Sequence, residues 1–208
     1  MGTRGHRLFA AGYDRMNAPA EREFLGPRRE RLLGELTGQV LDVGAGTGAN
    51  LRYLRRADRV VAAEPDPAMR RRLEKAATEA PVPVEVDDAA AEMLPYPDHE
   101  FDAVVFSLVL CTVADPARAL AEARRVLRPD GRLLVLEHVR GDGRLARWQD
   151  LVTPLWRRMV AGCHPGRDTR AAVVRAGFAF VEVEEFQPMP RWIPVSPWLC
   201  GVAEPVRR

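Results

Sequence analysis

A short apolar run that leads straight into three closely spaced glycines constrains this chain more than any other stretch of its sequence. Residues 40–43 read VLDV and residues 44–48 read GAGTG. The apolar run is typical of a buried parallel strand. Glycine lets the backbone turn sharply and leaves no Cβ between the backbone and a ligand. We therefore predict a strand that ends in a ligand-binding turn.

The glycine spacing narrows the class of ligand. A dinucleotide-binding turn of the G-x-G-x-x-G type would carry its third glycine at position 49, where this chain has Ala49. The pattern is instead G-x-G-x-G, with an acidic residue, Asp42, two positions ahead of it. This spacing resembles the first motif of the class I methyltransferases that use S-adenosyl-L-methionine (SAM). The resemblance implies a loop that cradles a methionine moiety and a ribose, with no pyrophosphate on a helix N-terminus.

Size and charge exclude several other classes of protein. The 208 residues suffice for one domain with a sizeable core. With 31 basic and 29 acidic residues the net charge is +2, so we expect no basic stripe that would bind nucleic acid. No apolar stretch reaches the roughly 18 residues that a membrane span needs. Residues 1–7 lack the build of a secretory signal, so we expect a cytoplasmic protein.

The cysteines predict neither a disulfide framework nor a metal site. Cys111, Cys163 and Cys200 are odd in number, lie far apart and include no C-x-x-C pair. We therefore expect free thiols in a reducing compartment and no bound metal. A lone buried cysteine usually behaves as a small apolar side chain, and Cys111 is interpreted in this way.

A second strand places an acidic residue beside the glycine turn. Residues 59–63 are mostly apolar, and Glu64 follows them, 20 positions after Gly44. Open α/β sheets bind ligands beyond the carboxyl ends of their strands. At this separation an acid can accept both hydroxyls of a ribose. Asp66 and Pro67 then form the N-cap and first turn of a helix.

Hydrophobic periodicity extends the alternation of strands and helices along the chain. Further strands are predicted at residues 82–86, 101–107, 133–139, 181–186 and 192–202, and helices at 47–56, 67–77, 116–127, 145–159 and 168–175. Residues 6–36 predict two helices broken around Pro19 or Pro27. Because the last two strands are joined without a helix, we expect them to form an antiparallel hairpin.

Further motifs follow at the spacings of the class I methyltransferases. They are residues 40–50, Glu64, Leu94-Pro95, Phe101-Asp102, residues 115–131 and Glu137-His138. The chain therefore resembles this superfamily over most of its length. The resemblance implies a single-domain Rossmann-like α/β fold with a seven-stranded, mostly parallel sheet and a C-terminal antiparallel hairpin. It also implies a helical lid at residues 1–36, and a SAM-binding domain at 37–208 with a helical insertion at about 144–166.

Within the superfamily, a smaller group of motifs is similar to the methyltransferase-like family 7, whose animal members are thiol S-methyltransferases. These motifs are residues 48–50, 108–113, 124–129, 137–139 and 192–195. The resemblance implies SAM as cofactor and S-adenosyl-L-homocysteine as product. The residues that it places at the cofactor are Asp42, Gly44, Ala45, Gly46, Thr47, Gly48, Asn50, Glu64, Pro65, Ala90, Ala91, Glu92, Ser107 and Leu108.

One position departs from the pattern of the superfamily. A segment D-A-x-x-L-P there supplies an aspartate to the adenine amino group, and the corresponding position in this chain is Ala90. Asp88, Glu92 or the backbone groups of residues 90 and 91 are the alternatives for this contact.

Candidate catalytic residues are less well defined. Residues 9–14 resemble an F-x-x-x-Y-D segment that covers the SAM pocket of many small-molecule methyltransferases, which would turn Tyr13 toward the methyl donor. His138 and His164 are candidates for the group that activates the acceptor, as are Glu137 and Asp14. Trp148 and Trp156, in the helical insertion, either belong to the core or wall off an apolar substrate.

The sequence therefore predicts SAM-dependent methyl transfer to a small, hydrophobic molecule, with a thiol favoured as acceptor. The alternatives are O- or N-methylation of a natural product or lipid headgroup, a nicotinamide-dependent oxidoreductase, and a non-catalytic SAM-binding protein. We expect a small-molecule acceptor and no nucleic acid. We also expect no transmembrane segment, which leaves peripheral membrane contact open, and a monomer or a homodimer.

Overall fold

The fold is built on a single mixed sheet. The computed structural model describes residues 3–206, and the side chains of residues 12–206. Its seven strands have the spatial order β3-β2-β1-β4-β5-β7-β6. They are β1 (Gln39–Val43), β2 (Arg59–Ala63), β3 (Val84–Asp87), β4 (Phe101–Ser107), β5 (Leu127–His138), β6 (Phe178–Phe186) and β7 (Trp198–Pro205). The first five are parallel, and β7 runs antiparallel to both β5 and β6. The predicted Rossmann-like fold with its C-terminal hairpin is confirmed.

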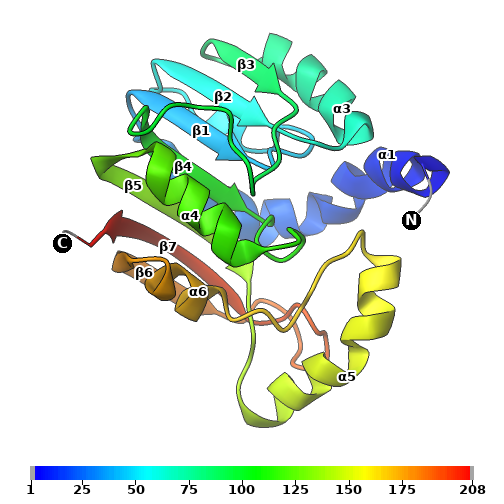
Figure 1. Ribbon diagram of the computed structural model, residues 1–208. Helices are drawn as coiled ribbons and strands as arrows, with labels where there is room; N and C mark the ends of the chain where they lie inside the picture. The colour runs from blue at the N-terminus through cyan, green and yellow to red at the C-terminus, as the bar shows by residue number, and fades with distance from the viewer. Residues whose placement is uncertain (1–2, 207–208) are drawn as a thin grey trace.

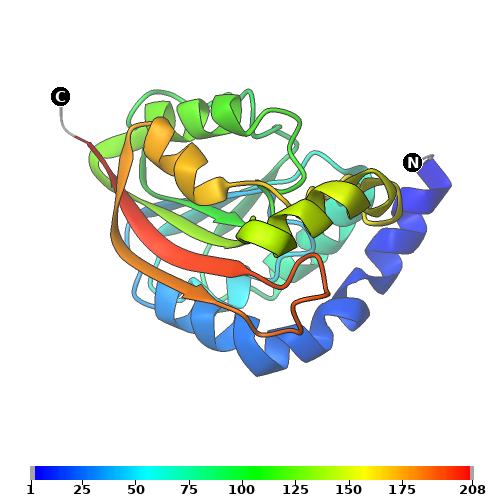
Figure 2. The same ribbon diagram turned by 90° about the horizontal axis from the view of Figure 1, so that it is seen from below.

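Helices cover both faces of this sheet. They are α1 (Thr3–Ala20), α2 (Gly26–Leu33), α3 (Pro67–Thr78), α4 (Pro116–Val126), α5 (Gly143–Met159) and α6 (Thr169–Arg175). Figure 2 shows α1 and α2 along one face, with α4 and α6 along the other. Successive strand residues point to opposite faces, so Val40 packs in the cluster that holds Leu73 of α3. Its neighbour Leu41 packs in the cluster that holds Leu120 of α4.

The N-terminal helices follow one another without the break that was predicted at the prolines. A π-helical turn, η1 (Glu21–Leu25), joins α1 directly to α2. The Gly26 N–H bonds to the carbonyl of Glu21, five residues earlier. This wider turn precedes Pro27, which has no N–H and would clash with the carbonyl four residues back in a regular helix. Pro19 lies inside α1.

The helix predicted at residues 47–56 is wrong. The chain passes instead through turns into one short 3₁₀ segment, η2 (Leu51–Tyr53). Gly48 has a φ of 89°, which an α-helix does not allow. The N–H of Leu51 then bonds to the Gly48 carbonyl, three residues earlier, which closes a 3₁₀ turn.

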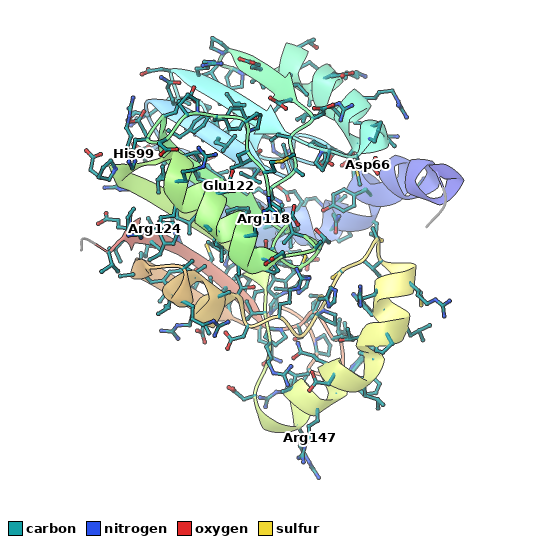
Figure 3. The ribbon with its side chains drawn as sticks, in the orientation of Figure 1. Asp66, His99, Arg118, Glu122, Arg124 and Arg147 are labelled. Carbon is teal, nitrogen blue, oxygen red and sulfur yellow. The ribbon has the colours of Figure 1, made fainter. Side chains whose placement is uncertain are left out.

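A buried glutamine joins the insertion after β5 to three neighbouring loop segments. Figure 1 shows α5 apart from the two helical layers, beyond the end of β5. The Gln149 side chain on α5 donates to the carbonyls of Val139, Pro165 and Pro194 at 2.8–3.1 Å. Arg147 points from the same helix away from the rest of the molecule (Figure 3). Within residues 3–206, no helix combines the length and apolar character that crossing a bilayer requires.

Candidate functional site

A cavity of about 1330 Å³ opens at the carboxyl ends of the central strands. Its lining takes in Glu64 after β2, Gly46 after β1, Ser107 at the end of β4 and His138 at the end of β5. These four strands are consecutive in the sheet. Since neighbouring strands lie ~4.8 Å apart, Glu64 and His138 are separated by roughly 14 Å along the edge of the sheet. The strand order reverses between β1 and β4, which is where open α/β sheets bind ligands.

The three glycines of the loop have different roles. All are left-handed, with φ values of 65° at Gly44, 60° at Gly46 and 89° at Gly48. A Cβ on Gly44 would lie 2.6 Å from the side chain of Val109, and one on Gly48 would lie 2.8 Å from the Cβ of Ala76. At Gly46 the nearest atom would be 3.9 Å away. Gly44 and Gly48 therefore allow close packing, whereas Gly46 offers bare backbone to the cavity.

Glu64 connects the loop to the next helix. Its Oε2 accepts the N–H of Gly46 at 2.9 Å, and its Oε1 accepts the N–H of Asp66 at 2.8 Å. Asp66 in turn caps the start of α3, where Figure 3 labels it. Burial raises the pKa of the Glu64 carboxyl, and the two backbone bonds oppose the change. A carboxylate has about four acceptor positions, so both oxygens keep capacity for a ribose hydroxyl.

A buried polar network supports the loop from behind. Asp42 is 1% exposed and does not line the cavity, and its Oδ1 accepts the Asn50 amide at 2.8 Å. The Asn50 Oδ1 accepts from the Arg29 guanidinium, which also donates to Ser107 Oγ at 2.7 Å. Burial raises the pKa of Asp42 to about 7, against the Asn50 hydrogen bond and the Arg29 charge. The network joins α2 to the ends of β1 and β4.

Sequence reasoning did not find Arg29, although the sequence carries a signal for it. Arg29 is 5% exposed and lines the cavity. It stands four residues after Leu25 and three before Leu32, on the apolar stripe of its helix. A charged residue in the middle of such a stripe is buried only when it is paired.

The loop after β4 is held by a buried carboxylate. Leu108 has a φ of 62°, a left-handed conformation that is strained for leucine. Glu137 is fully buried, and its Oε1 accepts the N–H groups of Val109 and Leu110 at 2.6 and 2.7 Å. Burial raises the pKa of Glu137 to about 7, and the charge of His138 and these bonds oppose it. Glu137 is not among the described residues that line the cavity, and its contacts are those of a positioning residue.

Two cysteines and a histidine form a cluster at the β5 end of the cavity. The Sγ of Cys163 lies 3.2 Å from Nε2 of His138, and the ligand atoms of Cys111, His138 and Cys163 lie within 4.8 Å of one another. All three are buried and line the cavity. Hydrogen bonds with Cys111 and His138 lower the pKa of Cys163 to about 4. The bond with Cys111 has the largest effect, and burial opposes the change. Burial has the largest single effect on His138 and lowers its pKa, but the hydrogen bond to Cys163 and the charges of Cys163 and Glu137 together raise it, and the net change is upward.

The interpretation of Cys111 as an isolated apolar side chain is therefore incomplete. Cys111 has two titratable partners, which lie 27 and 52 positions away in the sequence. His164 is the sequence neighbour of Cys163, but it is absent from the described residues that line the cavity. Its backbone N–H bonds to the carbonyl of Cys111 at 2.8 Å. Burial, followed by the charge of Arg167, lowers the pKa of the His164 ring.

Helix α1 closes over the cavity. Tyr13 lines it, and burial raises the pKa of this phenol to about 12, which keeps it neutral. Asp14 lines it as well and accepts the hydroxyl of Thr47 at 2.5 Å, so α1 is hydrogen-bonded to the glycine loop. The side chain of Phe9, the first residue of the predicted lid motif, lies outside the described side chains, as do residues 1–2 of the predicted lid.

Of the candidates for an adenine contact, Glu92 and Ala91 line the cavity, whereas Ala90 and Asp88 do not. One oxygen of Glu92 accepts the N–H groups of Ala114 and Asp115 at 2.8 and 3.2 Å. The other oxygen can accept an amino group. Asp88 has a largely exposed side chain and lies 3.9 Å from Arg70. The remaining predicted cofactor residues, including Ala45, Pro65 and Leu108, line the cavity.

Comparison with known proteins identifies what this chain is similar to. The profile of a family described as a methyltransferase domain matches residues 41–135. Thiol S-methyltransferase TMT1B of Rattus norvegicus is 35% identical over 171 residues, which cover 79% of this chain and 69% of the rat protein. Human thiol S-methyltransferase TMT1A is 34% identical over 186 residues, covering 87% and 73% of the two chains.

The fold has a counterpart among solved structures. Burkholderia thailandensis 1,6-didemethyltoxoflavin-N1-methyltransferase, solved with its substrate and S-adenosylhomocysteine, superposes with a TM-score of 0.68. The superposition covers 99% of this chain and 88% of the other, at 18% sequence identity.

Proposed function

The chain belongs to the class I SAM-dependent methyltransferases, and from this premise we propose that it transfers the methyl group of SAM to the sulfur atom of a small hydrophobic thiol. The observation that carries the proposal is a cavity with two chemically different ends. The glycine loop and Glu64 form one end, and the Cys111–His138–Cys163 cluster lies at the other. The relatives named thiol S-methyltransferases cover most of the chain and favour sulfur as the acceptor atom.

The residues at the first end fit SAM. When bound, the cofactor supplies a methyl group on a positively charged sulfur, which is already activated for transfer. Glu64 would accept the ribose hydroxyls with its two remaining acceptor positions. The bare backbone at Gly46 would admit the methionine moiety. Glu92 would accept the adenine amino group in place of the missing aspartate at Ala90.

Orientation is the main contribution that this chain has to make. Holding the acceptor in line with the methyl group supplies much of the rate of such a transfer. Leu108, Trp156 and Val195 present apolar surface to the cavity that His138 also lines, which suits a hydrophobic acceptor. Tyr13, from α1, would close the cavity over the methyl donor and exclude water.

A thiol acceptor also has to lose its proton, because the thiolate is the nucleophile. The cluster of Cys111, His138 and Cys163 is the group of titratable side chains at the acceptor end of the cavity. We therefore assign activation of the acceptor to this cluster, in which His138 supplies the imidazole. A phenol, whose pKa is near 10, would be activated less readily by the same group.

The test is a set of three acceptors that share one ring: a substituted thiophenol, the matching phenol and the matching aniline. The purified protein is incubated with SAM and each acceptor, and the products are identified by mass spectrometry. The expected product is the thioether, with equimolar S-adenosylhomocysteine. A Gly46→Val variant, which should not bind SAM, controls for uncatalysed methylation. Methylation of the phenol or aniline with none of the thiol would refute the acceptor and leave the family assignment intact.

A further inference from the structure

The Cys111–His138–Cys163 cluster has the composition of a metal site. Two thiols and one imidazole are the donors that Zn²⁺ prefers, whereas Mg²⁺ and Ca²⁺ take oxygen ligands. Because the three side chains are buried, they lose little conformational freedom when they bind one ion together. Sequence spacing gave no indication of a metal, because the three residues come from three different segments of the chain.

The distances agree with one tetrahedral ion. Zn–S bonds of about 2.3 Å and Zn–N bonds of about 2.0 Å place neighbouring ligand atoms roughly 3.5–3.8 Å apart. The Sγ of Cys163 is 3.2 Å from Nε2 of His138, and all three ligand atoms lie within 4.8 Å of one another. Shifts of a few tenths of an ångström to about 1 Å would therefore complete the site.

Rigid backbone holds the three ligands in place. His138 is the last residue of β5 and pairs with Trp198 of β7, whose ring it meets edge to face at 5.9 Å. The loop that carries Cys163 is joined to Cys111 by the hydrogen bond from the His164 N–H to the Cys111 carbonyl. The ligands are thus positioned by the sheet and by one shared backbone bond.

The cluster also leaves one coordination position open. All three side chains line the cavity, so a fourth ligand can reach an ion held by them from the cavity side. Three protein ligands with an open fourth position are the arrangement of catalytic zinc sites, including Cys₂His sites. Two thiolates and a neutral imidazole balance the charge of Zn²⁺, so the bound ion adds no net charge to a buried site.

We propose that Cys111, His138 and Cys163 bind one Zn²⁺ ion, and that the fourth ligand is the sulfur of the methyl acceptor. The second part rests on the proposed function. A thiol that coordinates zinc gives up its proton to water and stays a thiolate at neutral pH. The acceptor sulfur then forms a bond to the methyl carbon as the bond from that carbon to the sulfonium breaks. The electron pair of the broken bond goes to the leaving sulfur, and the neutral thioether leaves the ion.

The metal is tested without any acceptor. The full chain, produced with zinc in the medium and purified in reductant, is expected to hold about one Zn²⁺ per chain by mass spectrometry of the metal. The metal-free protein should bind Co²⁺ with a thiolate-to-cobalt charge-transfer band. Cys111→Ala, Cys163→Ser and His138→Ala should each retain less than about a tenth of the zinc.

Matched controls separate metal binding from general damage. Cys200→Ala removes the remaining buried thiol, and His164→Ala removes the imidazole next to Cys163; both should keep the zinc and the cobalt band. Calorimetry with S-adenosylhomocysteine checks that every variant is folded. The site is refuted if the folded wild type binds no zinc above the level of the Cys163→Ser variant, or if Cys111 and Cys163 form a disulfide in reductant.

The zinc site and the thiol acceptor can be refuted independently of each other. Zinc-loaded protein that methylates no thiol would refute the proposed function and the role of the fourth ligand while leaving the metal site intact. Protein stripped of its zinc that methylates thiols at an unchanged rate would refute the acceptor sulfur as the fourth ligand and leave the proposed function intact.

Discussion

Replacing Asp42 by asparagine should make the protein more stable, by an amount that grows as the pH rises from about 4 to about 7. The carboxyl of Asp42 is 1% exposed at the end of β1. One oxygen accepts the Asn50 amide at 2.8 Å, and the other has no partner among the described residues. Burial therefore raises the pKa of Asp42 from 3.8 to about 7, although the Asn50 bond and the Arg29 charge oppose the change.

The magnitude follows from the difference between the two pKa values. Each unit is worth about 1.4 kcal/mol, so the shift at Asp42 corresponds to roughly 4 kcal/mol. Because the pKa is raised in the folded state, folding favours the protonated form. This contribution to stability is complete below the unfolded pKa of 3.8 and is lost as the pH rises through about 7. Asparagine has nearly the same shape, keeps an oxygen for Asn50 and never ionises.

The assay is urea unfolding of the variant and the wild type at about pH 5 and about pH 8. The difference in unfolding free energy between the two proteins should grow by roughly 3 kcal/mol in favour of Asp42→Asn from the lower to the higher pH. Asp88→Asn is the control, because its largely exposed carboxyl should give a much smaller change. A difference for Asp42→Asn that is the same at both pH values would contradict the raised pKa, since Asp42 would then ionise normally in the fold.

Three further substitutions test the cofactor end of the cavity. Glu64→Gln should weaken SAM binding by about 1.5–3 kcal/mol, because charge-assisted hydrogen bonds to the ribose are lost; unchanged affinity in calorimetry would place the ribose elsewhere. Gly46→Val should abolish SAM binding with little change in the circular dichroism spectrum, because the valine side chain would fit the open space beside residue 46 and occupy the place of the cofactor; normal binding would show that the cofactor does not pass this residue. Arg29→Met should lower the unfolding free energy by about 1–3 kcal/mol in urea, because the Asn50 oxygen loses its donor, and an equally stable variant would contradict the role of this network.

The glycine loop and its acidic partner could be predicted because their signals are local. The apolar run at residues 40–43, the glycines that follow and Glu64 all lie within about 25 positions of one another. The alternation of strands and helices gave the order of elements and the C-terminal hairpin for the same reason. The conformation of the loop after the glycines was harder to predict from the sequence. The spacing of the apolar residues predicted a helix at residues 47–56, but the left-handed φ at Gly48 directs the chain into a 3₁₀ turn.

The acceptor end of the cavity could not be predicted, because its residues are distant in the sequence and are brought together by the order of the strands in the sheet. Cys111, His138 and Cys163 approach one another only because β4 and β5 are neighbours in the sheet and the chain returns to their ends after α5. Arg29 was missed for another reason. Its position on an apolar stripe signals burial, but its partners, Asn50 and Ser107, lie on other segments.

A molecule that carries both a thiol and a hydroxyl on the same aromatic ring would show which of the two atoms accepts the methyl group. The enzyme would be supplied with SAM bearing an isotopically labelled methyl group, and the product would be examined by NMR to find the atom that carries the label. We expect the labelled methyl group on sulfur, with the hydroxyl untouched. Label on oxygen would contradict this expectation, because a site built for a thiolate would then have passed over the more acidic and more nucleophilic group.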